Sequence, residues 1–400
     1  MKKDNTNKYN NKRAKILLKG VVPSFVGIFI PKNKKRVILT STRNEFYNFN
    51  SRYLFEYFIE NYPDYEVKYV INDEEKRRGL NEKFGVENNY FIETESLKGM
   101  WYALQAKTWC ISALETPVGG VFLKFNRMVL HLGHGAYFRS ALFLENTLPW
   151  HKRLYYHVIK NNFSHHLITS DEIAKVAPKM FGCKESQIAI LGEPMNDRIF
   201  NPNEKLFKSI FGEKILEQKN ILYAPTWRQD GSLKLFPFDD MEWDNFVAFL
   251  EENNINIFLR MHPSYEEDLS FYTSKTENLK IMDSKAVEDV NEVIALFDMV
   301  ITDYSSVYAG YLLLHKSLLF LSYDLEEYAR NTGFVVPYDK ATAGPKPKTM
   351  KSFKEEILKL LNDEKYYLAE RKEASVLFNG TNMDNNSKQV AEFIVSKQGV

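Results

Sequence analysis

The alternation of strand-like and helix-like segments is the feature that most limits how this chain can fold. One series of apolar runs and helical patterns fills residues 36–132, and a second series fills residues 219–362. Strands that alternate with helices form parallel sheets, because each crossover places a helix on a face of the sheet. Two series of similar size predict an α/β protein with two doubly wound, Rossmann-like domains that face a cleft.

Local periodicity gives the expected elements of each series. In the first series we expect strands at 36–40, 67–71, 108–112 and 128–132. Helices are expected at 51–61 and 96–107. In the second series we expect strands at 219–224, 255–260, 279–282, 298–302 and 318–323. Helices are expected at about 241–252, 285–296, 306–315 and 351–362. A turn-like stretch at 201–204 places the boundary near residue 205. We therefore expect an N-terminal domain at 32–205 and a C-terminal domain at 206–400.

Composition excludes several classes of protein. A chain of 400 residues exceeds one small core and fits about two domains. The net charge of +1 argues against a globally basic nucleic-acid binder. The only cysteines, Cys110 and Cys183, fit a reducing compartment and exclude a metal site built from cysteines.

Residues 1–31 form a segment of their own. Lysine and arginine far outnumber the single acid, Asp4, within residues 1–19, and an apolar stretch follows from Gly20 to Pro31. That stretch has about 12 residues, whereas a membrane-spanning helix needs about 20. No small-residue cleavage site follows it, so we do not expect a secretion signal. Basic residues beside apolar ones predict a segment that lies on an anionic membrane surface; a basic tail followed by a core helix is the alternative.

A short motif near residue 303 predicts an anion site. The apolar run 299–301 reads as a buried strand, and Thr302-Asp303-Tyr304-Ser305-Ser306 leads from it into a helical pattern. First-turn N–H groups of a helix are unpaired and lie at the positive end of the helix dipole, so they attract phosphate. The alternative is an ordinary helix cap, because aspartate and serine are favoured there.

Two more strand ends carry polar residues in the same half of the chain. The expected strand near 221 ends at Thr226, Trp227 and Arg228, and the one near 257 ends at Arg260, Met261 and His262. Ligands of open α/β sheets bind outside the carboxyl ends of the strands. A phosphate or diphosphate of a nucleotide-activated substrate is therefore expected at this edge, although Arg260 could equally form an inward salt bridge.

A third candidate lies in the first half of the chain. The expected strand at 128–132 runs into Gly133, His134 and Gly135, preceded by His131. Glycine lets the backbone approach a ligand closely, and histidine accepts protons near neutral pH. His131 faces the opposite side if the strand persists, which favours a structural role. For His134 taken alone, a core or turn histidine is the alternative.

The chain resembles the CDP-glycerol glycerophosphotransferase family, enzymes that prime and polymerise teichoic acids and related capsule polymers. The resemblance covers roughly residues 125–380 and is carried, in order, by Tyr223-Ala224-Pro225-Thr226-Trp227-Arg228, Arg260-Met261-His262-Pro263, Thr302-Asp303-Tyr304-Ser305-Ser306 and Tyr323-Asp324-Leu325-Glu326-Glu327-Tyr328. It implies the GT-B fold and the transfer of a polyol phosphate, glycerol or ribitol, from a CDP-activated donor with release of CMP.

The resemblance also assigns roles to the motif residues. It implies that His134 is the general base and that His262 supports the diphosphate. The donor-binding residues would be Thr226, Arg228, Arg260, Thr302, Asp303, Ser305 and Ser306. Asp303 would orient its loop or bind a ribose hydroxyl, since an acid beside phosphate is repulsive. Residues that could bind the acceptor or orient the base are Gly135, Glu193, Asn196 and Asp197; Glu193 could equally be an exposed loop acid.

Two positions depart from the family pattern. Gly133 stands where the family usually has tryptophan, and Met195 stands where it usually has arginine. The sequence has no aspartate cluster that would demand a metal, and the helix dipole and histidine can replace one, so we expect no metal and no cofactor. The resemblance implies that domain 32–205 binds the acceptor and domain 206–400 binds the CDP donor. It also implies a lipid-linked saccharide or polyol-phosphate polymer as acceptor and a peripheral location on the cytoplasmic face of the cell membrane. In line with the net charge of +1, we expect no nucleic acid as a partner. The alternatives are a GT-B glycosyltransferase that uses a nucleotide sugar and a membrane-bound scaffold without enzymatic activity. The sequence leaves the polyol, the acceptor and the oligomeric state open.

Overall fold

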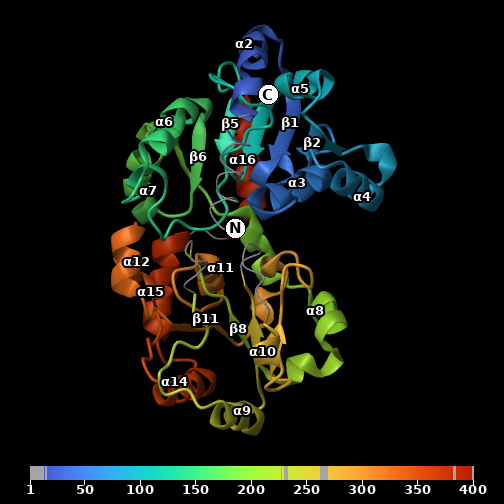
Figure 1. Ribbon diagram of the computed structural model, residues 1–400. Coiled ribbons are helices and arrows are strands. Elements are labelled where there is room, and N and C mark those ends of the chain that lie inside the picture. Colours follow the sequence, from blue (N-terminus) through green and yellow to red (C-terminus); the bar gives the residue numbers. More distant parts are fainter. Residues whose placement is uncertain are drawn as a thin grey trace. The chain divides into compact units, whose positions relative to one another are not determined.

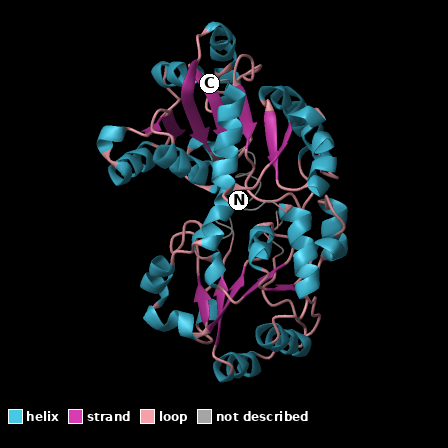
Figure 2. Ribbon diagram, turned by 180° about the vertical axis from the view of Figure 1, so that it is seen from behind, coloured by secondary structure: helices cyan, strands magenta, loops and turns pink. Residues whose placement is uncertain are grey.

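Two compact α/β units make up the protein. The computed structural model describes residue 13, residues 16–226, residue 228 and residues 233–261, 269–381 and 384–398. The first unit comprises the described parts of Met1–Gly135, Ala141–Asp197 and Asn382–Val400, and the second comprises those of Ala136–Ser140 and Arg198–Thr381. Each unit has strands flanked by helices (Figure 2), so the predicted α/β class is confirmed.

The first unit is built on a seven-stranded parallel sheet with the order β3-β2-β1-β4-β5-β6-β7. The strands are β1 Asn33–Thr40, β2 Glu66–Val70, β3 Phe91–Ile92, β4 Ala106–Ile111, β5 Met128–His131, β6 His165–Ile168 and β7 Ile188–Ile190. Alternate residues of β1 point to opposite faces, so Val37 and Leu39 join one apolar cluster and Ile38 joins another. Both faces are thus buried, as the uninterrupted apolar runs predict.

Helices cover both faces of this sheet. They are α2 Val21–Phe29, α3 Phe49–Asn61, α4 Glu74–Phe84, α5 Leu97–Leu104, α6 Trp150–Ile159, α7 Asp171–Phe181 and α16 Asn386–Gln398. On one face, Leu54, Phe55 and Phe58 of α3 share a core with Val390 and Ile394 of α16. Figure 1 shows α16, coloured red, among the blue and green elements of this unit. The helix α16, which the sequence-based boundaries place in the C-terminal domain of 206–400, therefore packs in the first unit.

The second unit contains a five-stranded parallel sheet with the order β10-β9-β8-β11-β12. Its strands are β8 Lys219–Tyr223, β9 Ile255–Leu259, β10 Leu279–Ile281, β11 Met299–Thr302 and β12 Ser317–Phe320. Its helices are α8 Glu204–Phe211, α9 Trp243–Glu252, α10 Ser270–Thr273, α11 Val307–Tyr311, α12 Leu325–Asn331, α13 Tyr338–Ala341, α14 Met350–Asn362 and α15 Leu368–Asn379. One core cluster joins Phe246 of α9 and Phe353 of α14 to Ile257 and Ile301 of the sheet.

Two local features differ from the sequence-based expectation. The helix expected at 285–296 is replaced by 3-10 turns at Val290–Glu292 and Ile294–Leu296. The Asp289 side chain accepts the N–H of Asn291, which starts a tight turn in place of a longer helix. In addition, Ala136–Ser140 belongs to the second unit, where Ser140 donates its N–H to Gly333 and the ring of Phe138 stacks on Phe334 at 5.0 Å.

Each sheet has one position where the strand order reverses direction. In the first sheet the reversal lies between β1 and β4, and in the second it lies between β8 and β11. Loops that leave such neighbours separate to opposite sides, and ligands of doubly wound proteins bind at that point. The reversals therefore direct attention to the chain after β1 and β4 and to the chain after β8 and β11.

Candidate active site

His134 lies on a tight loop at the carboxyl end of β5. Gly133 and Gly135 on either side adopt φ values of 70° and 124°, which only glycine reaches without strain. The replacement of the family's usual tryptophan by Gly133 is therefore part of this loop's geometry. Nδ1 of His134 lies 2.9 Å from the carbonyl oxygen of Ser112, directly after β4. A carbonyl only accepts, so Nδ1 carries the proton and Nε2 carries the lone pair that a general base needs.

The other histidine of this loop is buried. His131 is 3% exposed and packs against Phe163, His166 and Phe181. Burial, with a contribution from the nearby His134, lowers its pKa to about 3, so it is neutral at physiological pH. This arrangement fits the structural role that strand alternation predicts for it.

Glu193 holds the backbone of the His134 loop. Its carboxylate accepts the N–H of Gly135 at 2.8 Å and the side-chain amide of Asn50 at 3.0 Å. Burial raises the pKa of Glu193 to about 6, although both hydrogen bonds lower it. Glu193 is therefore not an exposed loop acid, and its hydrogen bonds go to the backbone beside His134 and to Asn50.

Asn196 and Asp197 have different surroundings. Asp197 accepts the N–H groups of Asn386 and Ser387, both at 2.8 Å, and so caps the N-terminus of α16. The side-chain oxygen of Asn196 is buried and has no partner among the described residues. Asp197 thus has a structural task that explains its presence without a substrate.

Thr302 and Asp303 lie at the reversal point of the second sheet and bind their neighbours. The hydroxyl of Thr302 donates to the carbonyl of Ala224 at 2.7 Å. Asp303 accepts the N–H groups of Thr226 and Tyr304 at 2.7 and 2.5 Å, so it ties the loop after β8 to the loop after β11. Of the alternatives for Asp303, this favours loop orientation.

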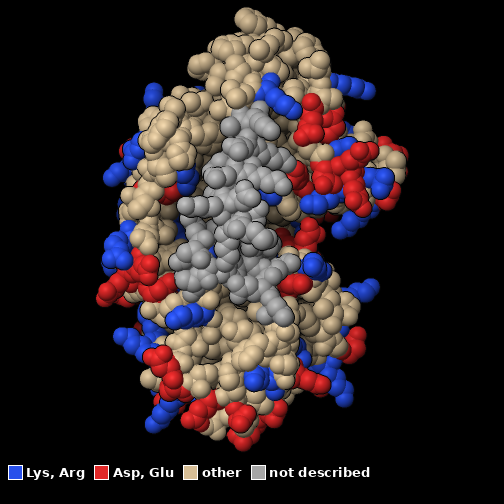
Figure 3. Space-filling model, in the orientation of Figure 1, with Lys and Arg blue, Asp and Glu red and all other residues tan. Residues whose placement is uncertain are grey.

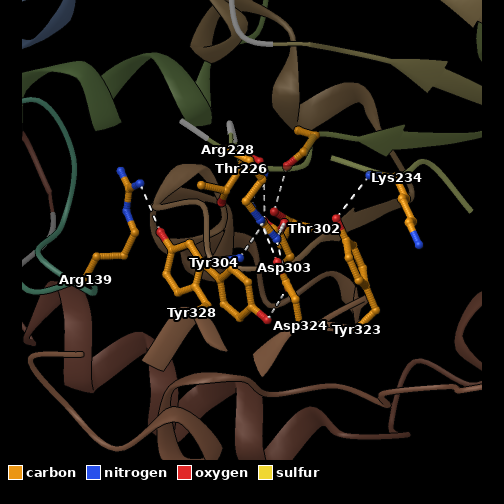
Figure 4. Close-up of polar contacts among 11 residues, drawn as sticks. Arg139, Thr226, Arg228, Lys234, Thr302, Asp303, Tyr304, Tyr323, Asp324 and Tyr328 are labelled. Carbon is orange, nitrogen blue, oxygen red and sulfur yellow. Dashed lines mark hydrogen bonds and ion pairs between the residues drawn. The ribbon is translucent and has the colours of Figure 1, made fainter. Parts of the chain in front are cut away.

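Arg228 is enclosed by acids and aromatic rings (Figure 4). It forms ion pairs with Asp303 at 2.9 Å and Asp324 at 2.8 Å, and it donates to the carbonyl of Thr226 at 2.8 Å. Burial lowers its pKa, but hydrogen bonds and charges from Asp324 and Asp303 raise it above its ordinary value. The guanidinium is 6% exposed. The expected donor-binding cation is therefore engaged within the protein.

Arg260 is also used internally. Its guanidinium donates to the carbonyl oxygens of Met282, Asp283, Val287 and Glu288, the shortest contact being 2.8 Å to Val287. Burial lowers the pKa of this guanidinium, with nearby acids opposing the shift. It braces the loop after β10, and neither a phosphate nor a side-chain ion pair is needed to explain its position.

The hydroxyls of Thr226, Ser305 and Ser306 remain as groups that could reach a ligand. Ser305 and Ser306 are half-buried at the start of α11. Ser305 makes one long contact, 3.4 Å to the N–H of Val307. The Thr226 hydroxyl is buried without a partner among the described residues. His262, the second expected catalytic residue, and Trp227 lie outside those residues.

Several residues of these networks were not predicted as site residues. In the sequence, Asn50 directly precedes the helix expected at 51–61, and Ser112 ends the strand expected at 108–112. Tyr304 and Asp324 of the second unit stand inside the recognised motifs, and the Tyr304 hydroxyl donates to Asp324 at 2.9 Å. Motif membership was the signal that could have identified this second pair, whereas no local signal marks the first.

Comparison with known proteins places these features in context. The sequence model of a family described as CDP-Glycerol:Poly(glycerophosphate) glycerophosphotransferase matches residues 24–396. A teichoic acid poly(glycerol phosphate) polymerase of Bacillus spizizenii is 27% identical over 390 residues, which cover 88% of this chain and 92% of that protein. A teichoic acid poly(ribitol-phosphate) polymerase of the same organism is 29% identical over 210 residues, 51% of this chain.

Solved structures show the same fold. The wall teichoic acid polymerase TagF has a TM-score of 0.74 at 20% identity, with 98% of this chain and 95% of that chain covered. A UDP-GlcNAc 2-epimerase from Neisseria meningitidis has a TM-score of 0.56 at 12% identity, with 90% and 99% covered. The chain spans 33% of the length of the ribitol-phosphate polymerase and 43% of a Bacillus subtilis glycerol phosphate polymerase.

Proposed function

Because this chain belongs to the CDP-glycerol:poly(glycerophosphate) glycerophosphotransferase family, we propose that it is a transferase for polyol phosphates. It transfers glycerol phosphate or ribitol phosphate from a CDP-activated donor to a hydroxyl of a lipid-linked or polymer acceptor in teichoic acid or capsule synthesis. The observation that carries this proposal is the hydrogen bond from His134 to the Ser112 carbonyl, which prepares Nε2 to act as a base.

The proposed reaction is an in-line phosphoryl transfer. Nε2 of His134 takes the proton of the acceptor hydroxyl while the acceptor oxygen forms a bond to the phosphorus of the polyol phosphate. The bond between that phosphorus and the bridging oxygen of the diphosphate breaks, and CMP leaves with the bonding electrons. Such reactions depend mainly on positioning and on stabilisation of charge.

Three hydroxyls support binding of the donor in the second unit. Those of Ser305 and Ser306 are accessible, and the buried hydroxyl of Thr226 lacks a partner among the described residues. Asp303 and Arg228 would support these groups without touching the donor, because their charges hold the loops that carry the hydroxyls. By resemblance, His262 stabilises the diphosphate leaving group. A TagF variant has been studied after a soak with CDPG, which fits such a donor.

A donor screen tests the proposal. Purified protein is incubated with CDP-glycerol, CDP-ribitol or a UDP-sugar and a soluble acceptor analogue, and release of the nucleotide is measured. We expect CMP from a CDP-polyol, and a release of CMP that is about 10²–10⁴-fold slower in the His134→Ala variant. His157→Ala is the matched control, because His157 is exposed and its Nδ1 also lies 2.9 Å from a backbone carbonyl. Turnover of UDP-sugars alone would favour a glycosyltransferase, and no turnover would favour a scaffold.

We also propose that the first unit binds a membrane surface through α2 and its neighbours. Val22, Phe25, Val26 and Phe29 are 71, 48, 47 and 85% exposed. The opposite side of α2 carries the small residues Ser24 and Gly27, which are buried. The surface over α2 is drawn almost entirely in the tan of uncharged residues in Figure 3. The helix thus packs on the protein through small residues and exposes an apolar stripe, and such a stripe is suited to insertion at a lipid interface.

Neighbouring elements extend this apolar surface. Leu97 and Trp101 of α5 are 81 and 50% exposed, and Phe122 and Phe125 are 52 and 58% exposed. Phe122 contacts Phe25 edge-on, with ring centroids 6.1 Å apart. Within the described residues no helix combines the length and hydropathy needed to cross a bilayer. Most of the expected N-terminal cations lie outside the described residues, and Arg13 is paired with Glu115 at 2.7 Å.

Point substitutions test this location better than a truncation. Ile30 is 4% exposed and belongs to a core cluster, so deletion of residues 1–30 would remove packing as well as lipid contacts. We expect Val22→Ser with Phe29→Ser to reduce sedimentation with phosphatidylglycerol vesicles, and high salt to reduce it further. Val86→Ser, at a residue that is 66% exposed, is the control. Binding that is unchanged in the double variant would contradict the proposal.

A further inference from the structure

The side chain of Asn50 makes two hydrogen bonds to the backbone beside His134 and two more to Glu193 and Met195. Asn50 lies in the first turn of α3, next to the reversal point of the first sheet, and its side chain is fully buried. Its amide nitrogen donates to the carbonyls of Leu132 and Gly133, both at 3.1 Å, and to Glu193 at 3.0 Å. Its amide oxygen accepts the N–H of Met195 at 3.1 Å.

These contacts join three distant parts of the chain. The sequence separations from Asn50 are 82 residues to Leu132 and 145 residues to Met195. Glu193 closes the arrangement, because the carboxylate that accepts from Asn50 also accepts the N–H of Gly135. The backbone on both sides of His134 is therefore held by one amide and one carboxylate.

The residues that flank Asn50 contact His134 and its partner. The ring of Phe49 lies 5.2 Å from the ring of His134, centroid to centroid, and Phe49 has a φ of 57°, which is uncommon for an aromatic residue. Ser51 donates its N–H to the hydroxyl of Ser112 at 2.8 Å. Since Ser112 also provides the carbonyl that orients His134, the first turn of α3 fixes the loop, the ring and the ring's partner.

We propose that Asn50 is a positioning residue for the transfer reaction, which aims Nε2 of His134 at the acceptor by holding Leu132, Gly133 and Glu193 together. The inference rests on the proposed function and adds a residue that does not touch substrate. An amide is needed at this position because it donates and accepts at once. Alanine would leave the N–H of Met195 without its acceptor, and aspartate would place a second carboxylate beside Glu193.

The test compares Asn50→Ala with Asn162→Ala. Asn162 is 2% exposed in the same unit, donates to Gly120 at 2.9 Å and accepts from Leu123 at 3.2 Å, so its hydrogen bonds among the described residues do not involve the His134 loop. We expect Asn50→Ala to lower kcat by about 10²-fold with the KM for the CDP donor unchanged, since displacement of a catalytic group by about 1 Å costs that much. Asn162→Ala should lose similar thermal stability but keep its kcat.

A double-mutant cycle separates positioning from general damage. If Asn50 acts through His134, Asn50→Ala should cause no further loss of turnover in the His134→Ala background. A further loss of about 10²-fold there would overturn the inference, as would an ordinary kcat in Asn50→Ala while His134→Ala is inactive. A fully active His134→Ala would instead overturn the proposed base, and the Asn50 assignment with it.

Asn50→Asp provides a second readout if the alanine variant folds poorly. The protonated carboxyl can donate one hydrogen bond and accept another, whereas the ionised form cannot donate. We expect the kcat of Asn50→Asp, relative to that of the unmodified chain, to recover several-fold as the pH falls from 8 to about 6. A ratio that does not change with pH, in a variant with an unchanged melting temperature, would contradict a positioning role.

Discussion

Two polar networks, one around His134 in the first unit and one around Asp303 in the second, are held together in different ways. Around His134, the contacts are hydrogen bonds among an amide, backbone groups and one buried acid, and no cation pairs with Glu193 among the described residues. Around Asp303, two carboxylates share Arg228, and the guanidinium also lies 5.0 and 5.1 Å from the rings of Tyr304 and Tyr328. One loop is positioned by hydrogen bonds to an amide and a single carboxylate, and the other by an ion-pair network.

The difference teaches which polar residues remain for a ligand. In the first unit the His134 side chain is exposed, and the Ser112 carbonyl orients it through Nδ1. In the second unit Arg228 is paired with Asp303 and Asp324, and among the described residues of this site the hydroxyls of Ser305 and Ser306 are the more accessible groups. Mutations at the two sites should therefore separate activity from stability, and four experiments examine this.

The largest effect is expected at His134. His134→Ala should lower turnover by about 10²–10⁴-fold, since it removes the general base. Its free energy of unfolding should change by no more than about 0.5 kcal/mol because the side chain is exposed. Steady-state kinetics and urea unfolding measure both quantities. A large loss of stability in this variant would show that the loop depends on the imidazole, which would break the contrast between the sites.

Arg228→Ala should behave in the opposite way. Removing the guanidinium leaves Asp303 and Asp324 as buried, uncompensated acids, which costs about 3–5 kcal/mol of stability. Arg330→Ala, at an exposed position of α12, is the control and should be nearly neutral. Urea unfolding followed by tryptophan fluorescence reports the change. An Arg228→Ala protein of ordinary stability that binds CDP weakly would return this residue to the set of direct ligands.

Smaller effects are expected at the serines of α11. Ser305→Ala and Ser306→Ala should each weaken binding of the CDP donor by about 1.5–3 kcal/mol, because each loses a hydrogen bond to a charged phosphate. Stability should hardly change, since neither hydroxyl is fully buried. Calorimetric titration with CDP-glycerol provides the measurement, and Ser274→Ala, an exposed serine elsewhere in the same unit, provides the control. Unchanged affinity in both variants would place the phosphate elsewhere.

The smallest effect is a dependence of stability on pH at Glu193. Burial raises its pKa from 4.5 to about 6, so between these values the folded state binds more protons than the unfolded state. Stability should therefore fall by about 2 kcal/mol as the pH rises through this window. Glu193→Gln keeps the acceptor for Gly135 and removes the proton, so its stability curve should lack this fall. Equal slopes for both proteins between pH 4.5 and 6 would refute the assignment.

The sequence predicts the architecture better than the contacts. Apolar runs identify most strands, and the ends of β5, β8 and β11 were expected to carry polar residues, as they do. The partners of those residues could not be predicted, because Asp324 lies 96 residues from Arg228 and Asn50 lies 143 from Glu193. Arg228 was expected to bind phosphate because of its charge. Its ion pairs with Asp303 and Asp324 depend on the fold, and a sequence does not show which acids lie beside a cation.

The return of α16 to the first unit has a consequence for synthesis of the chain. On the ribosome, Leu54 and Phe58 emerge more than three hundred residues before Val390 and Ile394, with which they share a core. Until α16 is made, the face of the first sheet that it covers stays without this helix while nearly all of the second unit is synthesised. Contacts between residues so far apart in sequence also form slowly. A chain that ends at residue 381 would contain the whole second unit, whereas its first unit would lack α16, expose part of its apolar core, and be prone to aggregation and proteolysis.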